Sequence, residues 1–182
     1  MLTIRPAHLW RITVAVLVLG AAACTESGRS AGRLDATWTG SDTGRFRAPA
    51  RALWCPAGGL LEITAIGTDS GVGIVLRPVA GLAPGNYPVF DAVAHEVGRP
   101  GAAVAIRWYA TGAIRAFRGD SGVVSLDRAE GTISGQVEAR MEGALEPGRL
   151  DLRARLRGIP IDTGTALCPP DSTARGMTTG VP

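Results

Sequence analysis

The strict alternation of apolar and polar side chains is the feature of this sequence that most restricts its fold. The alternation is clearest in residues 150–157, LDLRARLR, and in residues 132–141, TISGQVEARM. Successive side chains of a β-strand point to opposite faces of a sheet, so a period of two predicts strands with one buried and one solvated face. The chain also contains 25 Gly and 12 Pro, which are typical of turns between short strands.

Several other segments repeat this pattern and are predicted as strands. They cover residues 33–39, 45–54, 60–66, 72–79, 104–108, 114–118, 122–126 and 159–168. Residues 67–71 and 127–131 are predicted as hairpin connections, residues 82–87 as a type II turn, and residues 91–101 as a loop. About nine or ten short strands predict an all-β fold, either an antiparallel β-sandwich or a partly closed β-barrel. The pattern does not choose between these two architectures.

The first 23 residues have the composition of an export signal. Residues 1–11 carry Arg5, His8 and Arg11 without an acid, and an apolar run from Ile12 ends in small residues before Cys24. The run is shorter than the roughly 20 apolar residues that a transmembrane helix needs. We therefore expect a cleaved signal peptide at residues 1–23, a polar tether at 24–32, one β domain at 33–168 and a disordered tail at 169–182.

The segment Ala21-Ala22-Ala23-Cys24 resembles a bacterial lipobox, in which the cysteine receives a diacylglycerol and becomes the new N-terminus. This resemblance implies a lipoprotein that is anchored to the cell envelope through Cys24. Thr25 after the cysteine implies outer-membrane sorting, facing the periplasm or the surface, if the cell has two membranes. Lipoboxes usually have Leu where this chain has Ala21, so simple cleavage after Ala23 remains the alternative.

The number of cysteines agrees with a lipidated Cys24. The chain has three cysteines, and an odd thiol in an oxidising compartment requires an explanation. Acylation of Cys24 would leave Cys55 and Cys168 as one pair. We therefore predict a Cys55–Cys168 disulfide that joins early and late strands.

The charge of the mature chain is close to neutral. Two of the 19 cationic residues lie in the leader and none of the 16 acids does, which leaves 17 Arg against 16 acids, a net charge of +1. This balance argues against a bulk nucleic-acid binder. Arg153, Arg155 and Arg157 line one face of a predicted strand and form a possible surface for anionic headgroups or a polyanion. The alternative is a solvated face whose charges block strand addition.

The tripeptide Asp-Ser/Thr-Gly occurs four times, beginning at Asp42, Asp69, Asp120 and Asp162. Residues 161–167 resemble the catalytic segment of pepsin-like aspartic proteases, which would require Asp42 as the second carboxylate. Residues 119–122 resemble the nucleophile segment of trypsin-like serine proteases, with Ser121 as nucleophile and His95 as base. Pro160 interrupts the strand that should precede the first motif, and neither motif has its structural context. We interpret all four copies as turns and predict a protein without catalytic residues.

The remaining candidate residues point to no metal or cofactor. His95 is the only histidine after the leader, so a zinc site lacks its second imidazole. Trp38, Trp54 and Trp108 lie on apolar strand faces, where core packing is favoured over sugar stacking. Trp38 also resembles the tryptophan near the first strand of lipocalins, although Ala36 replaces their Gly.

Three hypotheses for function follow from these observations. The first is a membrane-tethered, non-enzymatic β domain that binds a partner protein or contributes to the envelope. The second, which the lipocalin resemblance implies, is a carrier of a small apolar ligand, with a cavity near Trp108, Phe117 and Val124. The third is a hydrolase.

Overall fold

The computed structural model describes residues 32–90, 99–110 and 112–164, and these residues form nine strands. The strands are β1 (Arg33–Gly40), β2 (Gly44–Cys55), β3 (Leu60–Ile66), β4 (Ser70–Arg77), β5 (Gly85–Phe90), β6 (Gly101–Ala110), β7 (Ala113–Glu130), β8 (Thr132–Gly143) and β9 (Arg149–Thr163). The predicted all-β class is confirmed.

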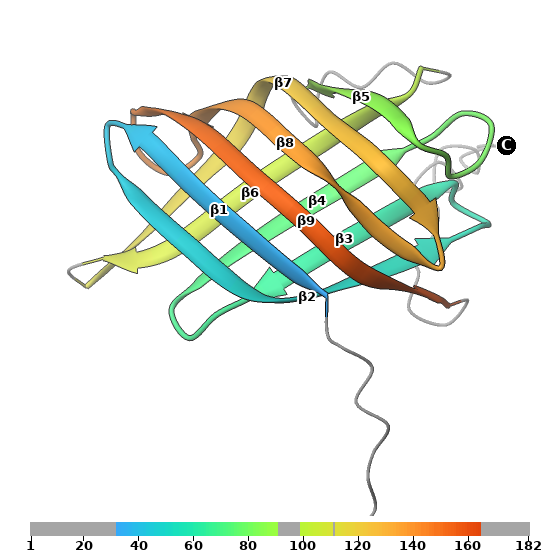
Figure 1. Ribbon diagram of the computed structural model, residues 1–182. Helices are drawn as coiled ribbons and strands as arrows, with labels where there is room; N and C mark the ends of the chain where they lie inside the picture. The colour runs from blue at the N-terminus through green and yellow to red at the C-terminus, as the bar shows by residue number, and fades with distance from the viewer. Residues whose placement is uncertain (1–31, 91–98, 111, 165–182) are drawn as a thin grey trace, which may run out of the picture. The chain divides into compact units, whose positions relative to one another are not determined.

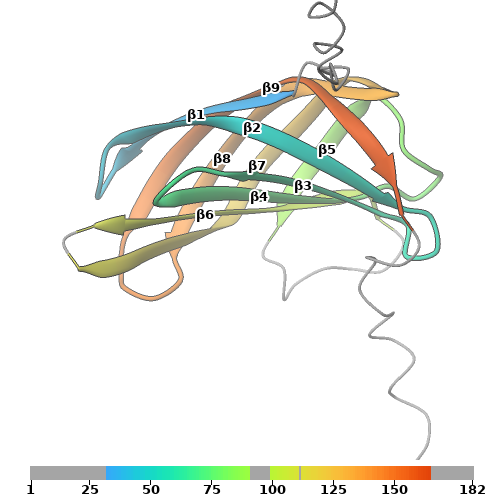
Figure 2. The ribbon, with the colours of Figure 1, turned by 90° about the horizontal axis from the view of Figure 1, so that it is seen from below.

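The nine strands form a single sheet that closes on itself. Their order is β1-β2-β3-β4-β6-β5-β7-β8-β9, and β1 pairs with both β2 and β9. Figure 1 shows β1 in blue between these two neighbours, and Figure 2 shows the sheet curving round to β6 and β7. All pairings are antiparallel except two short ones, β2 with β9 and β5 with β6.

Both parallel pairings occur where a neighbouring strand ends or is inserted. β1 begins at Arg33, and beyond that point residues 52–54 of β2 pair directly with residues 161–163 of β9. On the other side, residues 113–118 of β7 pair with β6, whereas residues 121–126 of β7 pair with β5. β2 and β9 therefore close the sheet beyond the start of β1, and β7 pairs with β6 along one part of its length and with β5 along the next.

Two predicted strand breaks are wrong, because irregularities inside continuous strands interrupt the alternation. Residues 114–118 and 122–126 belong to the single strand β7, which has register shifts against β8 between Gly119 and Ser121 and between Leu126 and Arg128. Residues 150–157 and 159–163 likewise form the single strand β9, interrupted by Gly158 with a φ of 55°. A bulge shifts the period by one residue, which in a sequence resembles the end of a strand.

Strand β5 was not predicted, because it hardly alternates. Its six residues, GNYPVF, include Gly85 and Pro88, and we had expected a turn in its first half. Its pairing with residues 121–126 of β7 holds it in the sheet. Long-range pairing thus determines a strand that local sequence does not specify.

The side chains that point into the closed sheet fill its interior. Leu34, Ile63, Ile74 and Ile133 are all 0% exposed, and alanines such as Ala50 alternate with these larger residues. A space large enough for water would leave accessible surface on the side chains around it. The described residues around these positions therefore form a packed apolar core.

An aromatic cluster occupies the interior near the β1–β2 and β6–β7 turns. The ring centroids of Trp38 and Trp108 are 4.9 Å apart, and those of Trp108 and Phe117 are 5.4 Å apart in a stacked arrangement. Gly44, the residue paired with Trp38, leaves room for the indole, because a Cβ there would lie 2.3 Å from Trp38 Cζ2. Core packing of Trp38 and Trp108 is confirmed.

Candidate functional site

Strands β2, β1, β9 and β8 lie side by side in the closed sheet (Figure 1). Their outer faces carry most of the arginines of the described residues. The apolar side chains of these strands point inward, so the alternate positions point outward. Nine arginines are exposed there, and we call this surface the arginine face: Arg33, Arg45, Arg47, Arg51, Arg140, Arg149, Arg153, Arg155 and Arg157.

The strand register arranges the charges of the arginine face in rows that cross the strands. The first row pairs Arg33 with Arg157. Going along β1, the next rows are Arg47–Asp35–Arg155–Gln136, Arg45–Thr37–Arg153–Glu138 and Thr39–Asp151–Arg140. Their net charges are +2, +1, +1 and 0. Positive charge therefore increases toward the start of β1, where the chain enters the domain.

Asp35 is the acid within the first two rows of the arginine face as given above. It accepts a hydrogen bond from Arg47 Nε, and Arg157 Nε lies 3.3 Å from its Oδ2. The side chain of Asp35 is 22% exposed, so it is shielded from water more than either arginine. The hydrogen bond from Arg47 is the largest cause that lowers the pKa of Asp35, and burial opposes it. The carboxylate therefore stays ionised and ties β1 to both neighbouring strands.

Asp35→Asn is expected to destabilise the fold in a pH-dependent manner. The folded-state pKa lies below the usual value of 3.8, so the carboxylate stabilises the fold above that value and loses its effect as the pH falls through the folded pKa. At neutral pH the loss should be about 0.5–1 kcal/mol, because the partner guanidinium groups are largely solvated. Urea unfolding of wild type and variant as a function of pH measures it.

The control for Asp35→Asn is Asp127→Asn, an exposed acid on β7 without an ion pair among the described residues. Its free energy of unfolding at neutral pH should lie within about 0.5 kcal/mol of that of the wild type. A difference between wild type and Asp35→Asn that stays constant down to strongly acidic pH would contradict the role assigned to the Asp35 carboxylate.

Two open grooves run along the arginine face. The larger has a volume of about 920 Å³ and lies between Arg45 and Arg47 of β2 and Arg153 and Arg155 of β9, with Thr37 between them. The second has a volume of about 700 Å³ and extends over β1, β9, β8 and β7. The grooves share Thr37, Glu138 and Arg153, so they form one continuous depression.

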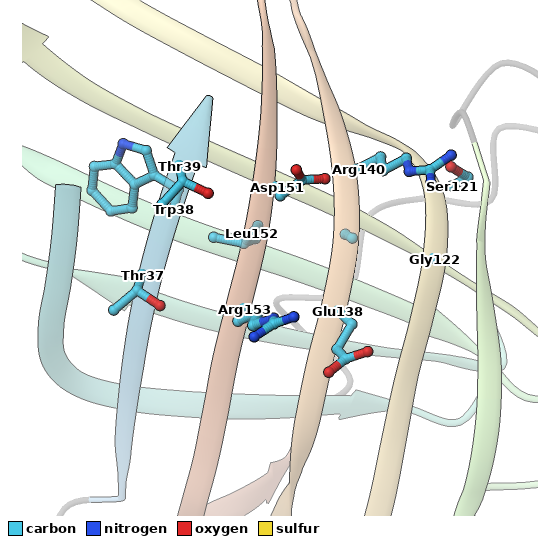
Figure 3. Close-up of a pocket in the computed structure, with 11 residues that line it drawn as sticks. Thr37, Trp38, Thr39, Ser121, Gly122, Glu138, Arg140, Asp151, Leu152 and Arg153 are labelled. Carbon is cyan, nitrogen blue, oxygen red and sulfur yellow. The ribbon is translucent and has the colours of Figure 1, made fainter. Parts of the chain in front are cut away.

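Figure 3 shows the second groove, in which opposite charges lie on neighbouring strands. Glu138 of β8 lies beside Arg153 of β9, and Arg140 of β8 lies beside Asp151 of β9. Ser121 and Gly122 of β7 form the far edge. This end of the depression is nearly balanced in charge, whereas the larger groove has an excess of guanidinium groups.

The structure places Arg153, Arg155 and Arg157 on the exposed side of β9, as the alternation predicted. Sequence reasoning did not connect them with the other six arginines of the arginine face. The outward positions of residues 33–39 and 45–54 gave a signal for Arg33, Arg45, Arg47 and Arg51. Only the pairing of β1 with β9 brings these residues together, and that pairing joins the two ends of the domain.

Of the predicted disulfide, only Cys55 lies within the described residues. It ends β2 and is 0% exposed. Nearby, the Gly164 amide donates a hydrogen bond to the carbonyl of Trp54, at 3.3 Å. Gly164 precedes Cys168 by four residues, a span of at most about 14 Å. Four extended residues after Gly164 are therefore enough for Cys168 to reach Cys55. Cys24, Cys168, His95 and the predicted signal peptide at residues 1–23 lie outside the described residues.

Three of the Asp-Ser/Thr-Gly copies lie at strand ends, and one does not. The copies at Asp42 and Asp69 lie in the β1–β2 and β3–β4 turns, and Asp162 lies near the end of β9. The predicted turn at Asp120 is wrong, because this copy lies inside β7 at the bulge. Asp42 follows the segment of β1 that pairs with the start of β9, so it is separated from Asp162 by about 40 Å along that strand. The structure does not bring the two carboxylates together.

The described part of the chain offers no group of three or more His, Cys, Asp or Glu residues that could hold a metal ion. Within these residues, no helix has the length and apolar character needed to cross a membrane. No known protein family, curated protein or solved structure matches the chain.

Proposed function

We propose that this protein is a lipid-anchored, non-enzymatic β domain that binds a partner at the cell envelope through the arginine face. The observation that carries this proposal is the gathering of nine exposed arginines on four adjacent strands of a domain that is otherwise close to neutral. A surface of this kind attracts anionic groups and presents rigid, multidentate donors to them.

The layout of the N-terminal sequence supports the tether. Cys24 is followed by eight small and polar residues, TESGRSAG, before β1 starts at Arg33. A segment of this length spans at most about 30 Å. An acyl chain on Cys24 would therefore keep the domain close to the membrane surface. The disulfide between Cys55 and Cys168 belongs to the same proposal, since export provides the oxidising compartment it needs.

The positions of the protease-like motifs support a binding role over hydrolysis. Asp42 and Asp162 are far apart, and Ser121 lies on a strand bulge at the edge of an open groove. Aspartic proteases need two carboxylates that share a proton, which this separation does not allow. Turnover of an ester, peptide or glycan substrate that is lost on Ser121→Ala or Asp162→Ala would contradict the proposal.

The packing of the interior favours a surface binder over a carrier of apolar ligands. Trp108, Phe117 and Val124, which we expected around a carrier's cavity, are at most 9% exposed, and the first two are stacked. A carrier needs several hundred Å³ of enclosed space, typically at least about 300 Å³. Such a space would require these side chains to separate.

The tether is tested by Cys24→Ser. We expect the wild type to remain with the membrane fraction after a high-salt wash and Cys24→Ser to move into the soluble fraction, because the acyl chains provide the salt-resistant part of the attachment. Thr25→Ser, which keeps the cysteine, is the control and should behave as wild type. Mass spectrometry of the wild type should show an acylated Cys24 at the N-terminus. Salt-resistant membrane association of Cys24→Ser would contradict lipid anchoring.

A further inference from the structure

We infer that the arginine face is the surface with which the domain lies against the anionic headgroups of the membrane that carries its tether. This inference rests on the proposed function and names the partner of the same surface. It predicts a domain that lies with β2, β1, β9 and β8 toward the bilayer.

Charge is segregated between two sides of the domain. Strands β2, β1, β9 and β8 carry nine arginines and five acids, a net charge of +4. The other described residues carry six arginines and seven acids, a net charge of −1. An anionic surface would therefore attract one side of the domain and orient it.

The first row of the arginine face holds two charges of the same sign. Arg33 and Arg157 are directly opposite one another on β1 and β9, an arrangement that is unfavourable for a sheet unless an anion lies between them. Asp35 contacts Arg157 but is shared with Arg47, so one carboxylate serves two guanidinium groups. A lipid phosphate at this row would supply the missing negative charge, and guanidinium groups bind phosphate oxygens in a bidentate geometry.

The position of the chain entry favours a membrane as the source of these phosphates. Arg33, the first residue of β1, belongs to the most basic row, and only eight residues separate it from Cys24. A lipid on Cys24 would therefore place this row nearest the headgroups. The larger groove begins at the next row along β1. It is lined by Arg45, Arg47, Arg153 and Arg155, and it is open to the outside, so lipid headgroups can enter it.

The test uses the full chain carrying Cys24→Ser, so that no acyl group contributes to binding. Co-sedimentation is measured with vesicles of phosphatidylcholine alone and of phosphatidylcholine mixed with phosphatidylglycerol, at increasing salt. We expect stronger binding to the mixed vesicles and a progressive loss of that difference as salt is added.

Two triple variants in the Cys24→Ser background separate the position of the charges from their number. The face variant is Arg45→Gln, Arg153→Gln and Arg155→Gln, which leaves both contacts of Asp35 intact. The control variant is Arg77→Gln, Arg99→Gln and Arg107→Gln, three exposed arginines in or next to β4 and β6. The net charge changes equally in both. The face variant should bind mixed vesicles at least about tenfold more weakly, and the control within about twofold of the parent.

Equal losses in the two triple variants would overturn the inference, because net charge alone would then explain binding. Binding of the parent to dextran sulfate but not to mixed vesicles would overturn it in favour of a polyanionic chain. Release of Cys24→Ser from cell membranes without charge-dependent vesicle binding would refute the inference and leave the tether standing. Charge-dependent binding by the face together with an unacylated Cys24 would instead contradict the proposed function.

Discussion

Cys55→Ala and Cys168→Ala are each expected to lower the free energy of unfolding of the oxidised protein by about 4–5 kcal/mol. The predicted disulfide would close a loop of about 110 residues, and in the chain-entropy model a loop of that length restricts the unfolded chain by this amount. Cys55 lies beside the point where β2 and β9 pair directly. The disulfide would therefore hold these two strands together where β1 no longer lies between them. Chemical denaturation of oxidised and reduced wild type, and of the variants, measures the effect.

The double variant distinguishes a disulfide from two independent cysteines. If the bond exists, Cys55→Ala combined with Cys168→Ala should cost no more than either single change, and reduction should affect the wild type alone. Without a bond, Cys55→Ala should cost only the small cavity left by a buried thiol, about 1–2 kcal/mol, and Cys168→Ala should cost less. Alkylation of both thiols in denatured, unreduced protein would refute the bond.

Gly122→Ala is expected to destabilise the domain by about 3 kcal/mol or more. Gly122 has a φ of 134°, which side chains rarely adopt, and it lies where β7 shifts its pairing after the bulge. A Cβ there would lie 2.1 Å from the carbonyl oxygen of Glu138 and 2.7 Å from Ala139 Cα. Both atoms belong to the backbone of β8, so the clash could be relieved only if β7 and β8 moved apart.

Gly73→Ala is the matched control for Gly122→Ala. Gly73 also lies inside a paired strand, β4, but a Cβ there would meet nothing within 4 Å. Alanine has less conformational freedom than glycine in the unfolded chain, so this change should be neutral or stabilising by up to about 1 kcal/mol. Equal stability of the two variants would contradict the close approach of β7 and β8 at Gly122.

Each strand is predictable from the sequence to the extent that its alternation of apolar and polar residues is regular. β3 matches its predicted range of residues 60–66, and β1 extends its predicted range by one residue, because no register shift interrupts the pairing of these strands. β7 and β9 were each divided in two, because the bulge near Ser121 and the left-handed Gly158 shift the period. β5 was missed, since pairing with β7 rather than its own side chains makes it a strand.

The candidate site was predictable only in part. Arg153 and Arg155 were identified because their strand alternates without interruption. Their neighbours Arg33, Arg45 and Arg47 lie more than 100 residues earlier, and no local pattern connects the two groups. The ion pairs of Asp35 with Arg47 and Arg157 were not predicted for the same reason.

The sequence alone determined the class of structure and the side of each strand that is buried, because a period of two fixes both wherever it is maintained. It also contains the apolar N-terminal segment and the cysteines from which anchoring and the disulfide are predicted. Only the tertiary structure decided that β1 pairs with β9 and closes the sheet, and therefore that arginines from opposite ends of the domain form one surface. Such long-range pairings depend on how all nine strands pack around a common interior, which no local segment specifies.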